Sequence, residues 1–193
     1  MKSHFFAVVS RMKNIYRWGL MRNTKQESLS EHSFEVAVVA HALCVIGNTR
    51  LAKNYNADFA AASALFHDTS EIITGDMPTP VKYFNEDIKS TYKQIEALAE
   101  DNLIGMLPAD LQPAYKSLYN PDEEIKRIIK AADKISALIK CRQELNMGNR
   151  EFEAAEKSTE KSIKAMRLAE ADIFLDEFME SFSLTLDEQR KGE

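Results

Sequence analysis

Apolar side chains recur at helical spacing along most of this chain, and few residues interrupt them. Only 6 glycines and 5 prolines occur among 193 residues, so few positions favour a turn or end a helix. The clearest stretch starts at Asn120-Pro121, a capping residue followed by a proline at the first helical position, and is closed by Gly148. The sequence therefore predicts an all-α fold with roughly six to eight helices, in a single compact domain over residues 1–193.

A second helix is expected at the centre of this domain. Ser28-Leu29-Ser30-Glu31 has the spacing of a capping box, and the residues after it are apolar nearly all round until Gly47. A helix of this kind is usually buried. Apolar periodicity predicts further helices over residues 4–14, 57–75, 86–104 and 150–180. The alternating pattern of residues 182–186 predicts a short extended piece.

Charge and composition exclude several classes of function. The formal net charge of −5 gives no basic surface for a nucleic acid polymer or an anionic membrane. A small anionic ligand stays open, because one local arginine or a metal suffices to bind it. Cys44 and Cys141 lie in apolar helical patterns typical of buried thiols, and no Cys-x-x-Cys pair is present for a structural zinc site. Without a signal peptide pattern, or an apolar run close to the ~20 residues of a membrane span, the protein is expected to be cytoplasmic.

The adjacent residues His67 and Asp68 stand inside the otherwise apolar run that begins Ala64-Leu65-Phe66. A charged group in an apolar interior costs several kcal/mol unless it is paired or binds a metal. If this stretch is helical, Glu71 lies one turn beyond His67 on the same face. The pattern predicts a metal site with its own acid/base group. A solvated surface position is the alternative for Glu71, and the apolar surroundings make it the weaker one.

Two further ligands are expected from other helices. His32 lies in the first turn of the most apolar helix, and Asp133 lies beside the buried stripe of its own helix. Taken alone, His32 could be a histidine of the capping turn and Asp133 an exposed partner of a neighbouring lysine. With His67 and Asp68 they make two imidazoles and two carboxylates, a set that suits a catalytic divalent ion with open coordination positions. The remaining histidines are expected to have no part in it, namely His4 and His41.

One histidine, then an adjacent His-Asp pair, then a distant aspartate is the ligand pattern of the HD-domain phosphohydrolase superfamily, which this chain resembles. The separations are 35 residues (67 − 32) and 65 residues (133 − 68). Within the superfamily the chain is similar to the bacterial 5′-deoxynucleotidases, which remove phosphate from deoxyribonucleoside 5′-monophosphates. The similarity rests on motifs spread over almost the whole chain: Arg17-Trp18, Leu20-Met21-Arg22-Asn23, Ser30-Glu31-His32-Ser33, Phe66-His67-Asp68-x-x-Glu71 and Thr74-Gly75-Asp76-Met77-Pro78-Thr79-Pro80-Val81-Lys82-Tyr83-Phe84-Asn85.

This resemblance implies an HD-domain helical bundle and a role for each matching position. One divalent ion, Co²⁺, Mn²⁺ or a similar transition metal, would be bound by His32, His67, Asp68 and Asp133. Glu71 would act as general acid/base, and Arg17 would serve in catalysis by holding the phosphate. The residues expected to bind substrate are Arg17, Trp18, His32, Asp68, Asp76, Met77, Pro78, Thr79 and Asp133.

On the nucleoside side the resemblance implies that Trp18 packs against the sugar or base and helps to exclude a 2′-hydroxyl. Core packing is the simpler role for this tryptophan. Asp76 would accept a hydrogen bond from the sugar 3′-hydroxyl. The family also implies a homodimer, which the apolar last helix could support.

Two other functions stay open at this point. The first is hydrolysis of a different nucleotide phosphate ester by the same kind of site, which the loop at 74–85 and the Arg17-Trp18 pair argue against. The second is a non-catalytic helical module that senses nucleotides. Such a module would tolerate the loss of Glu71 or of a metal ligand, whereas this chain retains them all.

Overall fold

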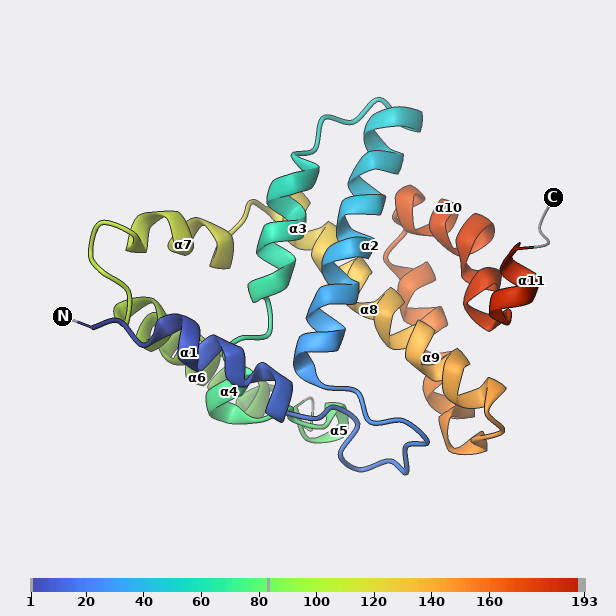
Figure 1. The fold of residues 1–193 in the computed structure, drawn as a ribbon, viewed down its shortest axis with the longest axis horizontal. Helices are drawn as coiled ribbons and strands as arrows, with labels where there is room; N and C mark the ends of the chain where they lie inside the picture. Colours follow the sequence, from blue (N-terminus) through green and yellow to red (C-terminus); the bar gives the residue numbers. More distant parts are fainter. Residues whose placement is uncertain (1, 83, 191–193) are drawn as a thin grey trace.

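Two long helices cross at the centre of the molecule in the computed structural model, which describes residues 2–82 and 84–190 (Figure 1). They are α2 (Leu29–Arg50) and α8 (Glu123–Asn146), and α3 (Ala57–Phe66) lies beside α2. The other helices are α1 (Phe5–Val9), α4 (Glu71–Thr74), α5 (Thr79–Lys82), α6 (Glu86–Gly105), α7 (Gln112–Tyr119), α9 (Glu153–Ala165), α10 (Ala169–Phe178) and α11 (Leu186–Arg190). Three 3₁₀ turns complete them, at Ser10–Asn14, Arg150–Phe152 and Met179–Ser183.

The all-α prediction is confirmed. Within the described ranges no strand forms, and the only β-type pairing is an isolated antiparallel bridge between Tyr16 and Ser28. The expected number of helices matches those with eight or more residues, which are α2, α3, α6, α7, α8, α9 and α10. Tyr83, part of the 74–85 motif, lies outside the described residues.

The main core lies where α2 and α8 cross. Leu43 of α2 and Ile135 and Ile139 of α8 have no exposed surface, and burying each such side chain contributes about 1.5–3 kcal/mol. Cys44 and Cys141 are buried free thiols, as predicted, and Cys44 belongs to this core. The crossing therefore holds the first turn of α2 firmly against the middle of α8.

A smaller core lies at the C-terminal end of α3. Phe5 of α1 packs with Leu103 and Leu107, and Phe66 and Tyr115 cover them. The Phe5 and Phe66 rings are stacked 6.3 Å apart, and Tyr115 meets Phe5 edge-on at 5.0 Å. This cluster fixes the last residue of α3, and with it the start of the polar stretch that follows.

The capping box predicted for α2 is present, but its predicted end is wrong. The Ser28 hydroxyl accepts a hydrogen bond from the Glu31 N–H (3.3 Å), and the Glu31 carboxylate accepts one from the Ser28 N–H (2.8 Å). The helix continues through Gly47 to Arg50. A Cβ at Gly47 would lie 2.7 Å from the Tyr55 ring, so the glycine permits a close approach of Tyr55 rather than a helix end.

The start of α8 also differs by a small shift. Asp122 is the N-cap, and its carboxylate accepts a hydrogen bond from the Ile125 N–H at 2.9 Å. Pro121 therefore precedes the cap and does not occupy the first helical position. Gly148 follows the end of α8 with a φ of +82°, as the sequence predicts.

Four stretches expected to be regular are broken instead. Residues 57–75 are divided into α3 and α4, and residues 150–180 into a 3₁₀ turn, α9 and α10, with a left-handed backbone at Arg167 (φ +49°). Residues 4–14 form α1 and a 3₁₀ turn. Of residues 182–186, Phe182 and Ser183 end a 3₁₀ turn, Leu184 has an extended backbone, and Leu186 starts α11, so the expected extended piece is reduced to a short link. The apolar pattern continues across such breaks because both parts pack on the same core, so periodicity alone does not reveal them.

By length and composition alone, α2 could cross a membrane, which corrects the expectation that no apolar run approaches that length. Its most apolar 18-residue window has a mean hydropathy of 1.4, and 56% of that window is buried inside the protein. A core helix meets the same criterion, because it too is apolar on most sides.

Candidate active site

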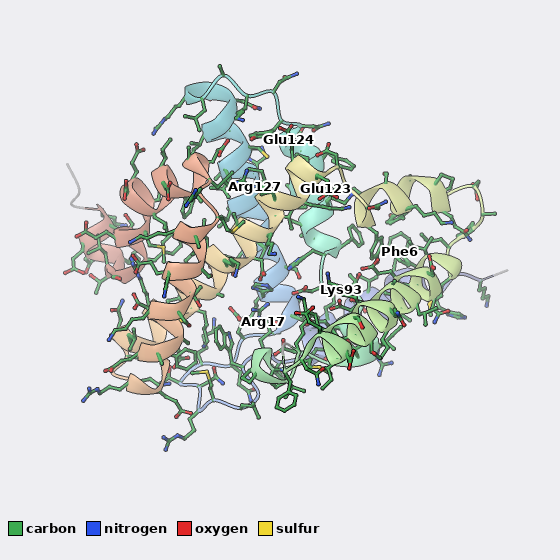
Figure 2. The ribbon with its side chains drawn as sticks, turned by 180° about the vertical axis from the view of Figure 1, so that it is seen from behind. Phe6, Arg17, Lys93, Glu123, Glu124 and Arg127 are labelled. Atoms are coloured by element: carbon green, nitrogen blue, oxygen red, sulfur yellow. The ribbon has the colours of Figure 1, made fainter. Side chains whose placement is uncertain are left out.

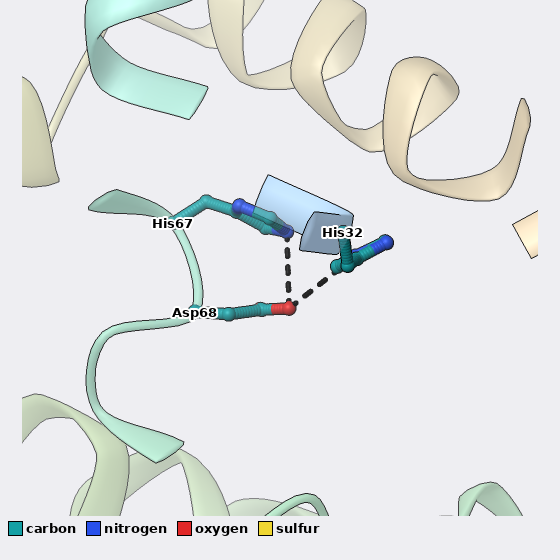
Figure 3. Close-up of side chains that lie close together, drawn as sticks. All are labelled: His32, His67 and Asp68. Atoms are coloured by element: carbon teal, nitrogen blue, oxygen red, sulfur yellow. Dashed lines mark ion pairs between the residues drawn. The ribbon is translucent and has the colours of Figure 1, made fainter. Parts of the chain in front are cut away.

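His67, Asp68 and Glu71 lie where α3 gives way to α4. α3 ends at Phe66, His67 caps it with helical φ and ψ (−61°, −33°), and α4 begins at Glu71. The expected continuous helix is therefore wrong, since residues 67–70 form a turn. Successive side chains of a regular helix point about 100° apart. In the turn, both side chains face one point, with His67 Nε2 3.1 Å from Asp68 Oδ2 (Figure 3).

His32 and Asp133 reach this point from the two central helices. His32 is fully buried, and its Nε2 lies 3.6 Å from Asp68 Oδ2 and 3.2 Å from Asp133 Oδ1. Possible metal-binding atoms of His32, His67 and Asp68 all lie within 4.8 Å of one another. The structure thus brings together all four predicted ligands, and it sets aside a capping role for His32, because Ser28 caps that helix.

The hydrogen bonds of the two imidazoles leave both Nε2 atoms free to bind a metal. His67 Nδ1 lies 2.7 Å from the Ala64 carbonyl oxygen, which can only accept, so the proton is on Nδ1. His32 Nδ1 lies 3.0 Å from the Ser136 hydroxyl, which donates its own proton to Glu35 at 2.6 Å and must accept from the imidazole. Both Nε2 atoms are buried without a hydrogen-bond partner.

These orphaned nitrogens, next to two carboxylates, fit a divalent transition metal. Imidazole nitrogens held by a second hydrogen bond, together with carboxylate oxygens, are typical ligands of such ions. Borderline ligands of this kind accept several metals, so the set does not select one of them.

The cluster also attracts positive charge. Burial alone lowers the pKa of His67, but Asp68 and then Asp133 outweigh it and raise that pKa to about 9. Burial opposes ionisation of Asp68, yet His67, His32 and Arg17 hold its pKa well below the ordinary range. For His32, burial and then Arg17 lower the pKa. Positive charge is therefore favoured between the carboxylates, where either a proton or a metal ion can supply it.

Glu71 is an acid kept neutral by its surroundings. Only 6% of its surface is exposed, and its Oε2 has no hydrogen-bond partner. Burial first, then repulsion from Asp68 and Asp76, raises its pKa to about 9. Burial excludes a solvated surface position, and the raised pKa favours the protonated carboxyl group at neutral pH.

Arg17 lies near the beginning of α2, as Figure 2 shows from behind. Its Nη1 is 3.5 Å from Asp68 Oδ2, and its Nε is 3.2 Å from Glu27 Oε2. One end of the guanidinium thus faces the cluster, while the other is held by a carboxylate in the loop before α2. Glu27 was not predicted, since it stands in a polar loop like any surface residue.

Trp18 is held in an unusual backbone conformation beside Arg17. Its φ of +61° is rare for a residue with a side chain. Its N–H donates to Asp76 Oδ2 at 3.2 Å, its indole Nε1–H donates to Glu27 Oε2 at 3.0 Å, and its ring lies 5.3 Å from that of Phe152. The structure therefore joins Trp18 and Asp76, both expected on the nucleoside side, although they are far apart in the sequence.

The loop that carries Trp18 is anchored on the end of α8. The Glu144 carboxylate accepts from the Thr24 N–H (2.9 Å), the Thr24 hydroxyl (2.6 Å) and the Asn149 side chain (2.8 Å), and it pairs with Lys140. Glu144 is 1% and Lys140 5% exposed. This buried ion pair fixes the loop against the central helix.

The predicted nucleoside segment follows α4. Gly75, with a φ of +74°, turns the chain, and the partly buried residues Met77 and Pro78 lead to Thr79, the first residue of α5. Of this segment, Asp76 is the residue that joins the site directly.

A cavity of about 260 Å³ opens beside the cluster, on a side that Arg17, Trp18, Glu71 and Asp76 do not line. His67 and Asp133 line it together with Ser63, Glu100, Tyr119 and Lys126. His41 is not part of the site, as predicted: it faces Asp58, with Nε2 3.6 Å from Oδ1. His4 precedes α1 at the edge of the fold.

Sequence comparisons give one family for most of the chain. Residues 4–182 match the family described as "5′-deoxynucleotidase YfbR-like". A 5′-deoxynucleotidase of Pectobacterium atrosepticum is 48% identical over 190 residues, which cover 97% of this chain and 96% of that protein. The 5′-deoxynucleotidase YfbR of Escherichia coli O1:K1 is 47% identical with the same coverage.

Solved structures share the fold. An HD-domain phosphohydrolase from Listeria innocua superposes with a TM-score of 0.81 at 26% identity, over 97% of this chain and 92% of that one. An HD phosphohydrolase of cyanophage S-2L, bound to dA and one catalytic Zn²⁺, has a TM-score of 0.69 at 19% identity, over 91% and 96%.

Proposed function

Because this chain belongs to the YfbR-like 5′-deoxynucleotidase family, we propose that its reaction takes place at the cluster of His32, His67, Asp68 and Asp133. The chain is a 5′-deoxynucleotidase, an enzyme that hydrolyses deoxyribonucleoside 5′-monophosphates to deoxyribonucleosides and phosphate. The family resemblance read from the sequence motifs is thereby confirmed.

The four residues of the cluster are proposed as the ligands of one divalent ion. The observation that carries this proposal is the pair of buried, unpartnered Nε2 atoms of His32 and His67, whose tautomers are set by Ser136 and Ala64. The chemistry that such an ion supplies when bound is polarisation of the phosphate and activation of water near neutral pH. Co²⁺ and Mn²⁺ are our candidates.

Glu71 is proposed as the general acid. Its buried, protonated carboxyl group stands at the start of α4, beside the turn that holds the ligands His67 and Asp68. It would donate its proton to the 5′-oxygen of the leaving nucleoside. The Glu71→Gln substitution should leave metal content unchanged and abolish most of the turnover.

Arg17 is proposed to bind the substrate phosphate, because a guanidinium matches phosphate oxygens in a planar fork. Its Nη1 end already faces the cluster. A phosphate in this position would also touch the ligands His32, Asp68 and Asp133.

The sugar and base are proposed to lie on the side of Trp18. The indole would pack against the sugar and leave no room for a 2′-hydroxyl, and Asp76 would accept from the 3′-hydroxyl. The backbone of Met77, Pro78 and Thr79 would line the rest of the nucleoside site. This side is favoured because Asp76 and Trp18 are hydrogen-bonded to each other next to Arg17.

Phosphate release from a panel of deoxyribo- and ribonucleoside 5′-monophosphates, with Co²⁺, Mn²⁺, Mg²⁺ or Zn²⁺ added to metal-free protein, tests these proposals. Release only from the deoxy compounds is expected. Equal rates for both sugars would refute the role of Trp18. Turnover without any metal would refute the ligand set, and preference for another phosphate ester would favour the alternative HD hydrolase.

A homodimer of single-domain, cytoplasmic chains is also proposed. The sequence points to the last helix as the contact, but a more exposed apolar stripe runs along α2, where Phe34 and Val38 are 67% and 53% exposed one turn apart. An apolar stripe of this kind is typical of a contact surface. The mass in solution of the wild type and of the double variant Phe34→Lys, Val38→Lys tests it; a monomeric wild type would refute the proposal.

A further inference from the structure

We propose that Glu27 is a positioning residue that fixes both Arg17 and Trp18 through one carboxylate oxygen. Phosphate binding and exclusion of a 2′-hydroxyl would then depend on the same group. This inference rests on the roles proposed above for Arg17 and Trp18. No motif marks Glu27, and its part in the site is visible only in three dimensions.

The contacts converge on a single atom. Glu27 Oε2 lies 3.2 Å from Arg17 Nε and accepts a hydrogen bond from Trp18 Nε1–H at 3.0 Å. The side chains of Arg17 and Glu27 are each 12% exposed. Ion pairs open to solvent contribute little, but here solvent screens the charges only weakly.

The geometry of Arg17 gives this contact a direction. Glu27 occupies the Nε end of the guanidinium, while Nη1 faces Asp68 at 3.5 Å. The contact at Nε is an ion pair and not an aligned hydrogen bond, so Glu27 attracts the Nε end of the planar, rigid guanidinium and leaves Nη1 toward the cluster. The free end of the fork is thereby aimed at the metal-ligand cluster, where the phosphate would lie.

Trp18 needs an external support because its backbone is strained. A φ of +61° for a residue with a side chain persists only when the surroundings hold it. Asp76 holds the Trp18 N–H, and the Asn23 side chain donates to the Trp18 carbonyl at 3.2 Å. Phe152 lies against the ring. Of these groups, Glu27 is the one that also contacts Arg17.

Glu27 itself is well placed to act as a fixed point. Its backbone carbonyl accepts from the Arg17 N–H at 3.0 Å, and the next residue, Ser28, caps α2. The carboxylate is therefore carried by the firm start of the central helix. Movement of this single side chain would remove one support from the arginine and the tryptophan together.

Trp18 is the only tryptophan in the chain, so its fluorescence reports on this arrangement without any turnover. We compare the metal-loaded wild type with three variants. Glu27→Ala removes the carboxylate. Glu27→Asp keeps the charge but withdraws it by one methylene, and Glu27→Gln loses the charge but leaves an oxygen that can accept from the indole. Glu151→Gln is the matched control. Glu151 binds Arg22, which lies in the loop that carries Arg17 and Trp18, but it contacts neither of those two side chains.

In Glu27→Ala and Glu27→Asp, we expect the emission to shift to longer wavelength and acrylamide to quench it more strongly. Glu27→Gln and Glu151→Gln should match the wild type. The preference for deoxy over ribo substrate should fall at least about fivefold in the first two variants, from the loss of a hydrogen bond to a charged group. The KM for the deoxynucleotide should rise in Glu27→Asp.

Unchanged emission and quenching in both Glu27→Ala and Glu27→Asp, at wild-type metal content, would overturn the proposal. If Glu27→Ala does not fold, Glu27→Asp alone decides it. A wild type that hydrolyses both sugars equally would instead refute the proposed role of Trp18. The fluorescence comparison would still decide whether Glu27 positions that side chain.

Discussion

Burying Glu71 as a neutral acid has a measurable thermodynamic consequence, which the Glu71→Gln substitution removes. Burial, followed by repulsion from Asp68 and Asp76, raises the pKa of Glu71 from 4.5 to about 9, while Arg17 and Lys82 act in the opposite direction. Between these two values the folded protein keeps a proton that the unfolded chain has lost. The stability of the metal-free protein must therefore fall as the pH rises through this range.

The size of the effect follows from the shift. Each pH unit above 4.5 costs the folded state about 1.4 kcal/mol, so the penalty near pH 7 is about 3 kcal/mol. Screening reduces this little, because Glu71 is only 6% exposed. Glutamine is neutral at every pH and has no such slope. The free energy of unfolding of Glu71→Gln, relative to the wild type, should therefore rise steadily with pH.

Urea unfolding of EDTA-treated protein, followed by circular dichroism at several pH values between about 5 and 8, measures this slope. Glu86→Gln is the control, since the Glu86 side chain is 87% exposed on α6 and should leave the pH profile of the wild type unchanged. Parallel profiles for the wild type and Glu71→Gln would refute the argument that Glu71 is protonated in the fold. With metal restored, Glu71→Gln should lose about 10²–10⁴-fold in turnover.

Three further substitutions test the support of the site. His67→Ala should abolish metal binding measured by elemental analysis, whereas His41→Ala should not; equal metal content in both would exclude His67 as a ligand. Ser136→Ala should weaken metal affinity about 10–100-fold by releasing the His32 tautomer, and an unchanged metal titration would contradict that role. Lys140→Met should destabilise the protein by about 3–5 kcal/mol in urea unfolding, because it leaves the Glu144 carboxylate buried without its partner; a loss below 1 kcal/mol would contradict the buried pair.

The proposed ligands could be predicted from the sequence as a set, because two of them are chemically out of place and the other two complete the ligand pattern of the family. His67 and Asp68 interrupt an apolar run, and His32 and Asp133 lie close to buried stripes of the two helices that cross at the core. What could not be predicted is the backbone at the site. The apolar pattern continues from α3 into α4, and it hides the turn that lets two adjacent side chains face one point.

The supporting residues were missed for a different reason. Ser136 occupies a buried position that a serine can fill without any function, and only its place between His32 and Glu35 reveals that it sets a tautomer. Glu27 stands in a polar loop, where a carboxylate is the ordinary residue. Its partners lie nine and ten residues away, across a chain reversal that the Tyr16–Ser28 bridge closes. A ligand is recognised by its chemistry, whereas a positioning residue is recognised by its geometry, which becomes visible only when the loop is folded.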